Sequence, residues 1–511
     1  MMASQLITLN INMALINLSK SDYIKGLQCP KALWFSKNQR DLKLPLDEQT
    51  KSKFESGNEI NDLARQYFLG GVKAADDYFD ISKAVTSTKN LISQNHEIIF
   101  EATAQIENDG SHARIDILRK SDGKNGWDLI EVKGSTSQKP SHLNDLSFQY
   151  HVFVEAGYKI NNTLVMLLNN DYVFDDKLDI GQLFKLEDIT QEVIEGQEEV
   201  RLHKDNLQKS LKGKLEPKVK IGAKCFEKDG HHPECDFKHH CWKNVPEYSI
   251  FNVTTRKKTA ETIIDEIDSY EVNDIDVSNY EKGIKELDII CYQTNKTHID
   301  KEKLSEFVSD LKYPLYFLDY ETFQLPIPIF QRARPYQQIP FQFSLHIQEK
   351  PNQELSHFEF LHQEKSDPRK DFILSLINNC GDNGSIIVYH ESFEKTINKQ
   401  LARDFPEYSE SLLNLNKRVI DLMVPFQKKY IYSPKQQSSN SIKKVLPAFT
   451  DLSYQNLEIK SGGDAMSIYA DFIKGKINLD EDLIKNLLEY CKLDTYAMVK
   501  LLQKIVKFSQ K

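Results

Sequence analysis

Two strand-rich stretches, separated by polar helical sequence, constrain the fold of this chain most strongly. The first, residues 96–170, contains the apolar runs HEIIFEATAQI, ARIDILRKS and WDLIEVKGS, then a helical segment and the run NNTLVMLLN. The second begins near residue 313 with LYFLDYETF and IPFQFSLHI, and helices dominate from residue 393 onward. Strands combined with helices in this way are typical of α/β folds. With 511 residues, the chain also exceeds what one hydrophobic core usually supports.

These features predict three consecutive parts. An N-terminal α/β domain covers residues 18–245 and ends in a Cys/His-rich stretch. A polar helical connector covers 246–310, and a C-terminal α/β domain covers 311–511. Near the start of the first part, Ser19 is a candidate N-cap, because a serine hydroxyl can accept a hydrogen bond from the first turn of a helix.

Composition and charge are those of an ordinary globular protein, with 40% hydrophobic and 28% charged residues. The net charge of −9 argues against a protein that coats nucleic acid by bulk electrostatics, although a local basic groove stays compatible with it. The apolar stretch at residues 1–20 lacks a basic n-region, and no later segment is typical of a membrane span. We therefore expect a cytoplasmic protein without a membrane partner.

A first group of polar residues lies on neighbouring strands of the N-terminal domain. Glu131 and Lys133 are two residues apart on one strand, so their side chains point to the same face, and Asp116 lies on the preceding strand. Two carboxylates can hold Mg²⁺ or Mn²⁺, and the lysine can offset developing negative charge. Gln149, on the following helix, could contact a phosphate or its water, and Glu101 is a further candidate carboxylate. A solvated sheet face would also produce this pattern.

The segment RIDILRKSDGKNGWDLIEVKG, followed by SFQYHVF, resembles the PD-(D/E)XK nuclease superfamily, and specifically its RecB-like branch. That resemblance implies a restriction-endonuclease-like core with a catalytic set made of Asp116, Glu131, Lys133 and Gln149. The branch also carries a Gly-x-x-x-His element, for which this chain has GNEIN. Asn61 stands where the histidine would be, which leaves the metal shell one ligand short unless Glu59 compensates.

Three cysteines follow this domain as C-x9-C-x5-C, and a fourth stands far upstream in LQCPKALWF. The RecB-like branch closes its nuclease domain with one cysteine before the core and three after it, which together bind a [4Fe–4S] cluster. The resemblance therefore implies a cluster held by Cys29, Cys225, Cys235 and Cys241. Zinc is the alternative, because a Cys₃His site could use a neighbouring histidine: His231, His232, His239 or His240. A site without metal is a third alternative.

A second group of polar residues is spread over the C-terminal domain. Asp319 and Glu321 share one strand face, and Glu394 falls in the first turn of a helix that follows the strand IIVYH. Tyr490 and Asp494 are four residues apart, which places them on one face of a helix. One site could collect all five and bind one or two divalent ions.

The motifs LDYET, HESFE and YCKLD, in this order, resemble those of the DEDD or DnaQ-like 3′–5′ exonucleases, which have the ribonuclease-H-like fold. That resemblance implies two divalent ions held by Asp319, Glu321, Glu394 and Asp494. Tyr490 would orient or deprotonate the attacking water, as in the tyrosine subtype. His390 replaces the usual asparagine of the second motif, and Glu394 is one methylene longer than the usual aspartate.

The whole chain from residue 18 to 511 resembles an uncharacterised bacterial family that joins these two domains, and ARPYQQIPFQFSLHI carries part of the likeness. We expect a metal-dependent nuclease with two centres that acts on DNA in repair, recombination or defence. The alternatives are a catalytically degenerate scaffold that binds nucleic acid, and an RNA 3′–5′ exonuclease. Because the chain has no G-x4-G-K-[ST] loop, unwinding driven by ATP would need a separate helicase.

Overall fold

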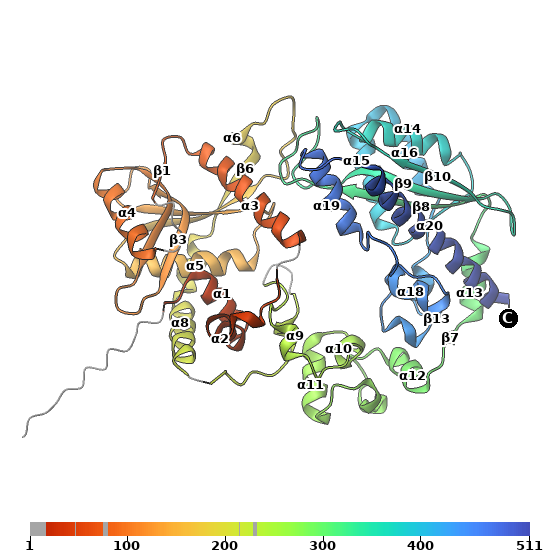
Figure 1. Cartoon of the computed structure of the whole chain (residues 1–511), viewed down its shortest axis with the longest axis horizontal. Coiled ribbons are helices and arrows are strands. Elements are labelled where there is room, and N and C mark those ends of the chain that lie inside the picture. Colours follow the sequence, from red (N-terminus) through yellow and green to blue (C-terminus); the bar gives the residue numbers. More distant parts are fainter. Residues whose placement is uncertain (1–16, 46–47, 75–79, 214, 228–231, 511) are drawn as a thin grey trace, which may run out of the picture. The chain divides into compact units, whose positions relative to one another are not determined.

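The computed structural model describes residues 17–45, 48–74, 80–213, 215–227 and 232–510 (Figure 1). Residues 1–16, which make up most of the apolar stretch that lacks a basic n-region, and His231 lie outside the described residues. The α/β class predicted from the sequence is confirmed. The chain divides into two units, which comprise residues 1–46, 54–169 and 179–243, and residues 47–53, 170–178 and 244–511.

The first unit is built on a six-stranded mixed sheet with strands in chain order. The strands are β1 (Val72–Lys73), β2 (Ile98–Gln105), β3 (His112–Lys120), β4 (Trp127–Lys133), β5 (Ile160–Leu168) and β6 (Phe184–Asp188). β2, β3 and β4 form an antiparallel meander, whereas β4 and β5 pair in parallel across helix α5 (Pro140–Glu155). The interior residues of β4 are all buried, as expected for a strand with neighbours on both sides and a helix above it.

The other helices of the first unit are α1 (Lys20–Gln28), α2 (Pro30–Asn38), α3 (Glu48–Tyr67), α4 (Ile81–Ser93), α6 (Ile180–Leu183), α7 (Thr190–Glu195), α8 (Gln197–Lys212) and α9 (Lys238–Cys241). The start of α3, up to residue 53, belongs to the second unit. Helix α5 packs on β3 and β5 and contacts α1, α7 and α8. Its Phe148 and Val152 are four residues apart and bury one face against Leu118 and Val165 of the sheet.

The second unit contains a five-stranded sheet with the order β10-β9-β8-β11-β12. The strands are β8 (Leu315–Phe323), β9 (Ile339–Gln348), β10 (Ser356–Leu361), β11 (Ser385–Val388) and β12 (Val419–Asp421). β8 pairs antiparallel with β9 and parallel with β11. The parallel strands are joined through helices α14 (Arg369–Asn379), α15 (Ser392–Asp404) and α16 (Ser409–Lys417).

Helices cover both faces of β8, so its alternate residues enter two different cores. Tyr316 and Leu318 pack with residues of α14, α15 and α16. Leu315 and Phe317 point the opposite way, toward the core that includes α19 (Gly462–Ile473) and α20 (Glu481–Gln510). The period of two along a strand therefore directs the odd-numbered residues Asp319 and Glu321 toward α19 and α20.

Residues 246–310, predicted as a helical connector, are largely helical and belong to the second unit. Their helices are α10 (Ile250–Val253), α11 (Lys257–Ile267), α12 (Glu286–Thr294) and α13 (Lys301–Ser309). A short antiparallel ladder joins β7 (His298–Ile299) to β13 (Ile431–Tyr432). Along the chain, β13 follows α17 (Val424–Gln427) and precedes α18 (Ile442–Phe449).

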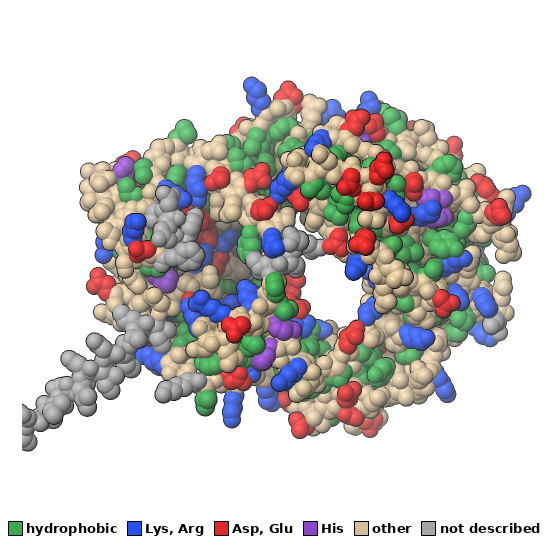
Figure 2. Space-filling model, viewed as in Figure 1, with side chains coloured by type: hydrophobic (Ala, Val, Ile, Leu, Met, Phe, Trp, Pro, Cys, Tyr) green, Lys and Arg blue, Asp and Glu red, His purple; other side chains and the backbone are tan. Residues whose placement is uncertain are grey.

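Charges of both signs are interspersed over the face drawn in Figure 2, in keeping with the modest net charge. Within the described parts of the chain, no helix is both long and apolar enough to cross a bilayer.

Candidate metal centres

A cavity of about 350 Å³ in the second unit is lined by all five residues of the second predicted group, which come from β8, α15 and α20. These residues are Asp319, Glu321, Glu394, Tyr490 and Asp494. Glu321, Glu394 and Asp494 are each at most 8% exposed. His390 also lines the cavity, with an exposed side chain and a left-handed backbone (φ 80°).

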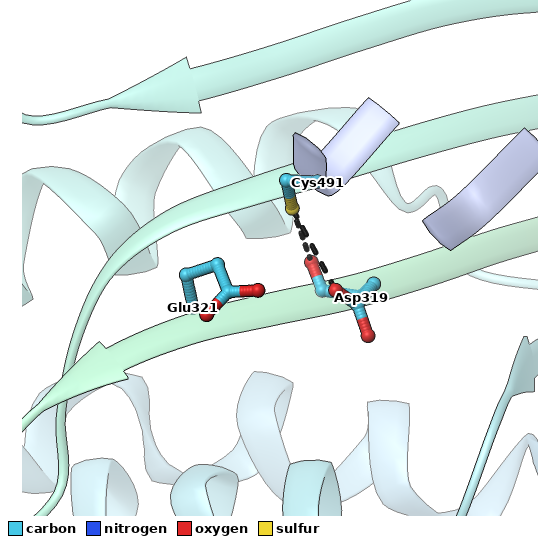
Figure 3. Close-up of side chains that lie close together, drawn as sticks. All are labelled: Asp319, Glu321 and Cys491. Carbon is cyan, nitrogen blue, oxygen red and sulfur yellow. Dashed lines mark hydrogen bonds between the residues drawn. The ribbon is translucent and has the colours of Figure 1, made fainter. Parts of the chain in front are cut away.

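Helix α20 brings three polar side chains to the strand acids. Tyr490 and Asp494 are one turn apart, and Cys491 lies between them. The Cys491 thiol contacts the carbonyl oxygen of Asp319 at 3.8 Å and its Oδ2 at 3.7 Å (Figure 3). One ligand atom each of Asp319, Glu321 and Cys491 lie within 4.8 Å of one another. The cysteine was not singled out from the sequence, although it stands inside the quoted motif YCKLD.

Glu394 is the most buried acid of this cavity, and one of its carboxylate oxygens is unsatisfied. Its side chain is 2% exposed, and its Oε2 has no hydrogen-bond partner among the described residues. Burial, with a smaller contribution from Asp421, raises the pKa of Glu394 to about 8. Asp421 itself accepts hydrogen bonds from the backbone N–H groups of His390 (2.9 Å) and Glu391 (3.2 Å), which fixes the turn before α15.

The remaining carboxyl groups repel one another. Burial and then the charge of Asp494 raise the pKa of both Asp319 and Glu321 well above the usual range. Burial raises the pKa of Asp494 to about 6, even though the Tyr454 hydroxyl donates to its Oδ1 at 2.5 Å. Buried carboxyls with raised pKa values that face a cavity are typical of functional sites and of sites for cations.

The lining of this cavity also includes a lysine, Lys443. Its charge lowers the pKa of Glu321 and of Asp494 without cancelling the effect of burial. The ammonium lies 5.5 Å from the ring centroid of Tyr490 and donates a hydrogen bond to the Lys460 carbonyl at 2.5 Å. Lys443 follows the polar loop SPKQQSSNS, and nothing in that sequence pointed to the cavity.

The structure also brings together the first predicted group, at the end of the β3–β4 ladder. The last pair of this ladder is Ile117 with Ile130. One step further, the Asp116 carboxylate accepts a hydrogen bond from the backbone N–H of Val132 at 2.8 Å. The side chain of Asp116 thus takes the place of a strand partner, next to Glu131.

Glu131 accepts hydrogen bonds on both oxygens. Oε1 receives the ammonium groups of Lys20 at 2.5 Å and Lys133 at 2.9 Å, and Oε2 receives the Gln149 amide at 2.6 Å. Burial alone would raise the pKa of Glu131, but Lys133 and Lys20 outweigh it and lower the pKa to about 2. Burial and the Glu131 charge raise the pKa of Asp116 to about 7.

Two residues of this first centre were missed in the sequence. Lys20 is the first residue of α1, whose start is set by the predicted Ser19 cap: the Ser19 hydroxyl accepts from the Asp22 N–H at 3.2 Å. Asp145, on α5, pairs with Lys133. Lys20 and Glu131 are 111 residues apart, so local sequence carries no signal of their contact.

The residues expected near the altered Gly-x-x-x-His element lie on α3. There Glu59 is exposed and Asn61 is partly exposed. The further candidate Glu101 forms an ion pair with Arg65 at 2.7 Å. Glu101 has a left-handed backbone (φ 57°), and the β2–β3 pairing skips it together with Asp116, the residue opposite it, without a shift of register.

The four predicted cysteines gather at the α1–α2 junction, although one of them precedes the others by almost two hundred residues. Cys29, Cys235 and Cys241 pack around an apolar cluster that includes Trp34, Phe35 and Phe237. The Cys235 N–H donates to the Cys225 carbonyl at 3.1 Å. Burial, with smaller contributions from the other three thiols, raises the pKa of Cys235 to about 11. All four are free thiols with partly buried side chains.

The neighbouring histidines differ in their surroundings. His239 is exposed, and His240 lies edge-on to the ring of Phe35. His232 Nδ1 lies 3.1 Å from the Gln28 amide. A set of four thiols fits a [4Fe–4S] cluster, and three thiols with one of these histidines would fit zinc.

Comparisons with known proteins give a family match and a distant relative. Residues 316–441 match a family described as Domain of unknown function (DUF2779), a stretch that includes Asp319, Glu321 and Glu394. The chain is also 28% identical over 210 residues to "Uncharacterized protein MG366" of Mycoplasma genitalium. That match covers 37% of this chain and 31% of the relative. No solved structure matches the chain.

Proposed function

We propose that the protein is a metal-dependent nuclease, and that the cavity of the second unit is its principal centre for phosphodiester hydrolysis. One observation carries the proposal: four acids from three separate elements, three of them buried, line a single cavity, and Glu394 Oε2 has no partner among the described residues. Asp319, Glu321, Glu394 and Asp494 would hold the divalent ions. The mixed sheet, with β8 at its centre, is compatible with a ribonuclease-H-like domain.

Bound divalent ions, Mg²⁺ or Mn²⁺, would supply Lewis-acid activation of the phosphate and a lowered pKa for the attacking water. The residues of the chain then have distinct tasks. Tyr490 orients the water with its hydroxyl, because burial and the nearby acids raise its pKa and keep it protonated. Lys443 supplies positive charge at the edge of the acids, where a phosphate would approach.

The proposed substrate is a DNA strand end. A cavity of about 350 Å³ is at the small end of ligand pockets, which suits one terminal nucleotide better than a duplex. Tyr389 and Phe393 line the same cavity, and aromatic rings can stack on bases without sequence preference. We propose that the protein removes nucleotides one by one from a 3′ end, as the resemblance of its three motifs to the 3′–5′ exonucleases implies.

For the first unit we propose a RecB-like PD-(D/E)XK centre at Asp116, Glu131, Lys133 and Gln149. Lys20 would have to release Glu131 before a metal ion could bind there. This contact favours a second candidate for the unit, which is binding of nucleic acid without cleavage. In either case the four gathered thiols would hold a structural [4Fe–4S] cluster, with zinc as the alternative.

The test measures degradation of labelled single-stranded DNA by the full chain with Mg²⁺ or Mn²⁺. Removal of a metal ligand by Asp319→Asn should lower the rate at least about 100-fold, since even indirect partners of metal ligands cost 10-fold to 100-fold when removed. The rate of Glu131→Gln shows whether the first unit contributes to degradation. Glu359→Gln is the control: it changes an exposed acid on β10, in the same sheet as Asp319, and should leave the rate unchanged.

If Asp319→Asn and Glu131→Gln both keep the full rate, neither centre performs the chemistry and the proposal is wrong. An RNA strand of the same sequence, tested in parallel, decides between the two substrates. Faster degradation of RNA would replace DNA as the proposed substrate.

The cluster has its own test. Protein purified without oxygen should be brown and contain iron, and Cys225→Ser should abolish the colour because one of four cluster ligands is lost. Cys291→Ser, which removes a buried thiol of the second unit, is the control and should leave the brown colour unchanged. A colourless wild type with one zinc per chain would assign zinc instead.

A further inference from the structure

The Cys491 thiol is a donor that the proposed two-ion chemistry does not use. It is fully buried, and it lies on the face of α20 that carries Asp494. Figure 3 shows its sulfur directed at Asp319, with the Glu321 carboxylate beside them. A thiol placed among carboxylates changes which metal ions a site prefers, because sulfur is a softer donor than oxygen.

The spacing of these donors fits a metal ion. For a tetrahedral ion with metal–sulfur and metal–oxygen bonds of about 2.3 Å and about 2.0 Å, sulfur and oxygen ligands lie about 3.5 Å apart. The observed separation of Cys491 Sγ from Asp319 Oδ2 is 3.7 Å. A ligand atom of Glu321 lies within 4.8 Å of both, so this carboxylate is a candidate third ligand.

A second observation, independent of the cysteine, also indicates a cation. Glu394 lines the same cavity, is 2% exposed, and has no partner for Oε2 among the described residues. A buried carboxylate oxygen without a hydrogen bond is costly unless a ligand satisfies it.

We propose that Asp319, Glu321 and Cys491 form a site for a transition-metal ion that accepts a thiolate, such as Zn²⁺ or Co²⁺. The inference rests on the proposed function for the two carboxylates, and it specifies the class of ion at one of the two positions. When the sulfur–metal bond forms, the thiol proton leaves to solvent, and its hydrogen bond to Asp319 is lost. A second ion position of the same cavity, near Asp494, has oxygen donors and suits Mg²⁺ or Mn²⁺.

The experiment titrates the full chain with Co²⁺ and records the near-ultraviolet absorbance of cobalt–thiolate bonds. The four cysteines of the first unit contribute equally in every variant, so the differences between variants report on Cys491. Cys491→Ser should lose the absorbance of one cobalt–sulfur bond. Asp319→Asn should lose the same absorbance, because it removes another ligand of the same ion. Cys380→Ser, which removes another fully buried thiol of the second unit, should match the wild type.

An unchanged spectrum for Cys491→Ser overturns the inference. If that variant does not fold, anomalous diffraction from crystals of the wild type with Co²⁺ gives the answer. A peak within bonding distance of Cys491 Sγ supports the site, and a cobalt peak in the cavity away from that sulfur rejects it.

Activity separates this inference from the proposed function. If Cys491→Ser loses the thiolate absorbance but the wild type degrades no nucleic acid with any ion, the metal site is supported and the nuclease proposal is wrong. If Asp319→Asn loses nuclease activity but Cys491→Ser has an unchanged cobalt spectrum, the nuclease proposal is supported and the thiolate ligand is wrong.

Discussion

The two acidic centres of this protein differ in how their buried negative charge is compensated. In the first unit, Glu131 receives two ammonium groups and one amide, and its pKa is lowered to about 2. In the second unit, four acids share a cavity whose described lining contains one lysine, and Glu394 and Asp494 have pKa values raised to about 8 and about 6.

This difference indicates how each centre would respond to a divalent ion. An ion that enters the second centre relieves repulsion among carboxylates, so binding is favoured by the charges already present. An ion that enters the first centre has to displace Lys20 from Glu131, so the cost of breaking this ion pair lowers the net free energy of metal binding. The second centre should therefore bind metal more tightly.

The largest expected effect is on the pH dependence of metal affinity. Metal ions bind the unprotonated carboxylate, and Glu394 is protonated below its pKa of about 8. Affinity at the second centre should rise at least about tenfold per pH unit between pH 6 and pH 8, because binding there releases one proton or more. Calorimetry of Mn²⁺ binding in buffers of different ionisation enthalpy measures the number of protons released. Glu394→Gln should lower that number by about one, and an unchanged number would contradict the assignment.

Stability should change in opposite directions at the two centres. Glu131→Gln leaves Lys20 and Lys133 facing a neutral amide in a buried site and should destabilise the protein by about 2 kcal/mol. Glu321→Gln removes one of several repelling acids and should stabilise the metal-free protein by about 1 kcal/mol at pH 8. Denaturant unfolding without metal measures both changes. Two changes of the same sign would break the contrast between the centres.

The same measurement has a defined pH dependence. Asp494 and Glu394 have pKa values above the ordinary value of about 4. Between about pH 4 and about pH 8 the folded protein therefore holds more protons than the unfolded chain. Stability of the metal-free second unit should fall as the pH rises through this window. Saturating Mn²⁺ should reverse the trend, because it binds the deprotonated carboxylates of the folded state.

The smallest expected effect concerns Lys20. Lys20→Met removes the charge that competes for Glu131 and keeps much of the volume of the side chain. Metal affinity at the first centre should rise roughly fivefold, equivalent to about 1 kcal/mol for a partly exposed ion pair. Lys25→Met, which breaks the Lys25–Asp236 pair elsewhere on α1, is the matched control. Weaker binding in Lys20→Met would show that Lys20 assists the centre instead of blocking it.

Sequence periodicity predicted the parts of the site that lie within one element. Spacing by two placed Asp319 and Glu321 on one face of β8, and spacing by four placed Tyr490 and Asp494 on one face of α20. The α/β class followed from the same patterns. These predictions succeed because the geometry of one strand or helix depends on the local backbone.

Contacts between distant segments were decided by the tertiary structure. Lys20 on Glu131, Tyr454 on Asp494 and Cys491 on Asp319 each join residues at least 40 positions apart. No periodicity links such positions, since their distance depends on how helices pack on the sheet. The amino-acid sequence by itself determined which faces carry the acids. Only the folded chain decided which charges face them, because the pKa of a buried carboxyl depends on neighbours that packing brings from elsewhere.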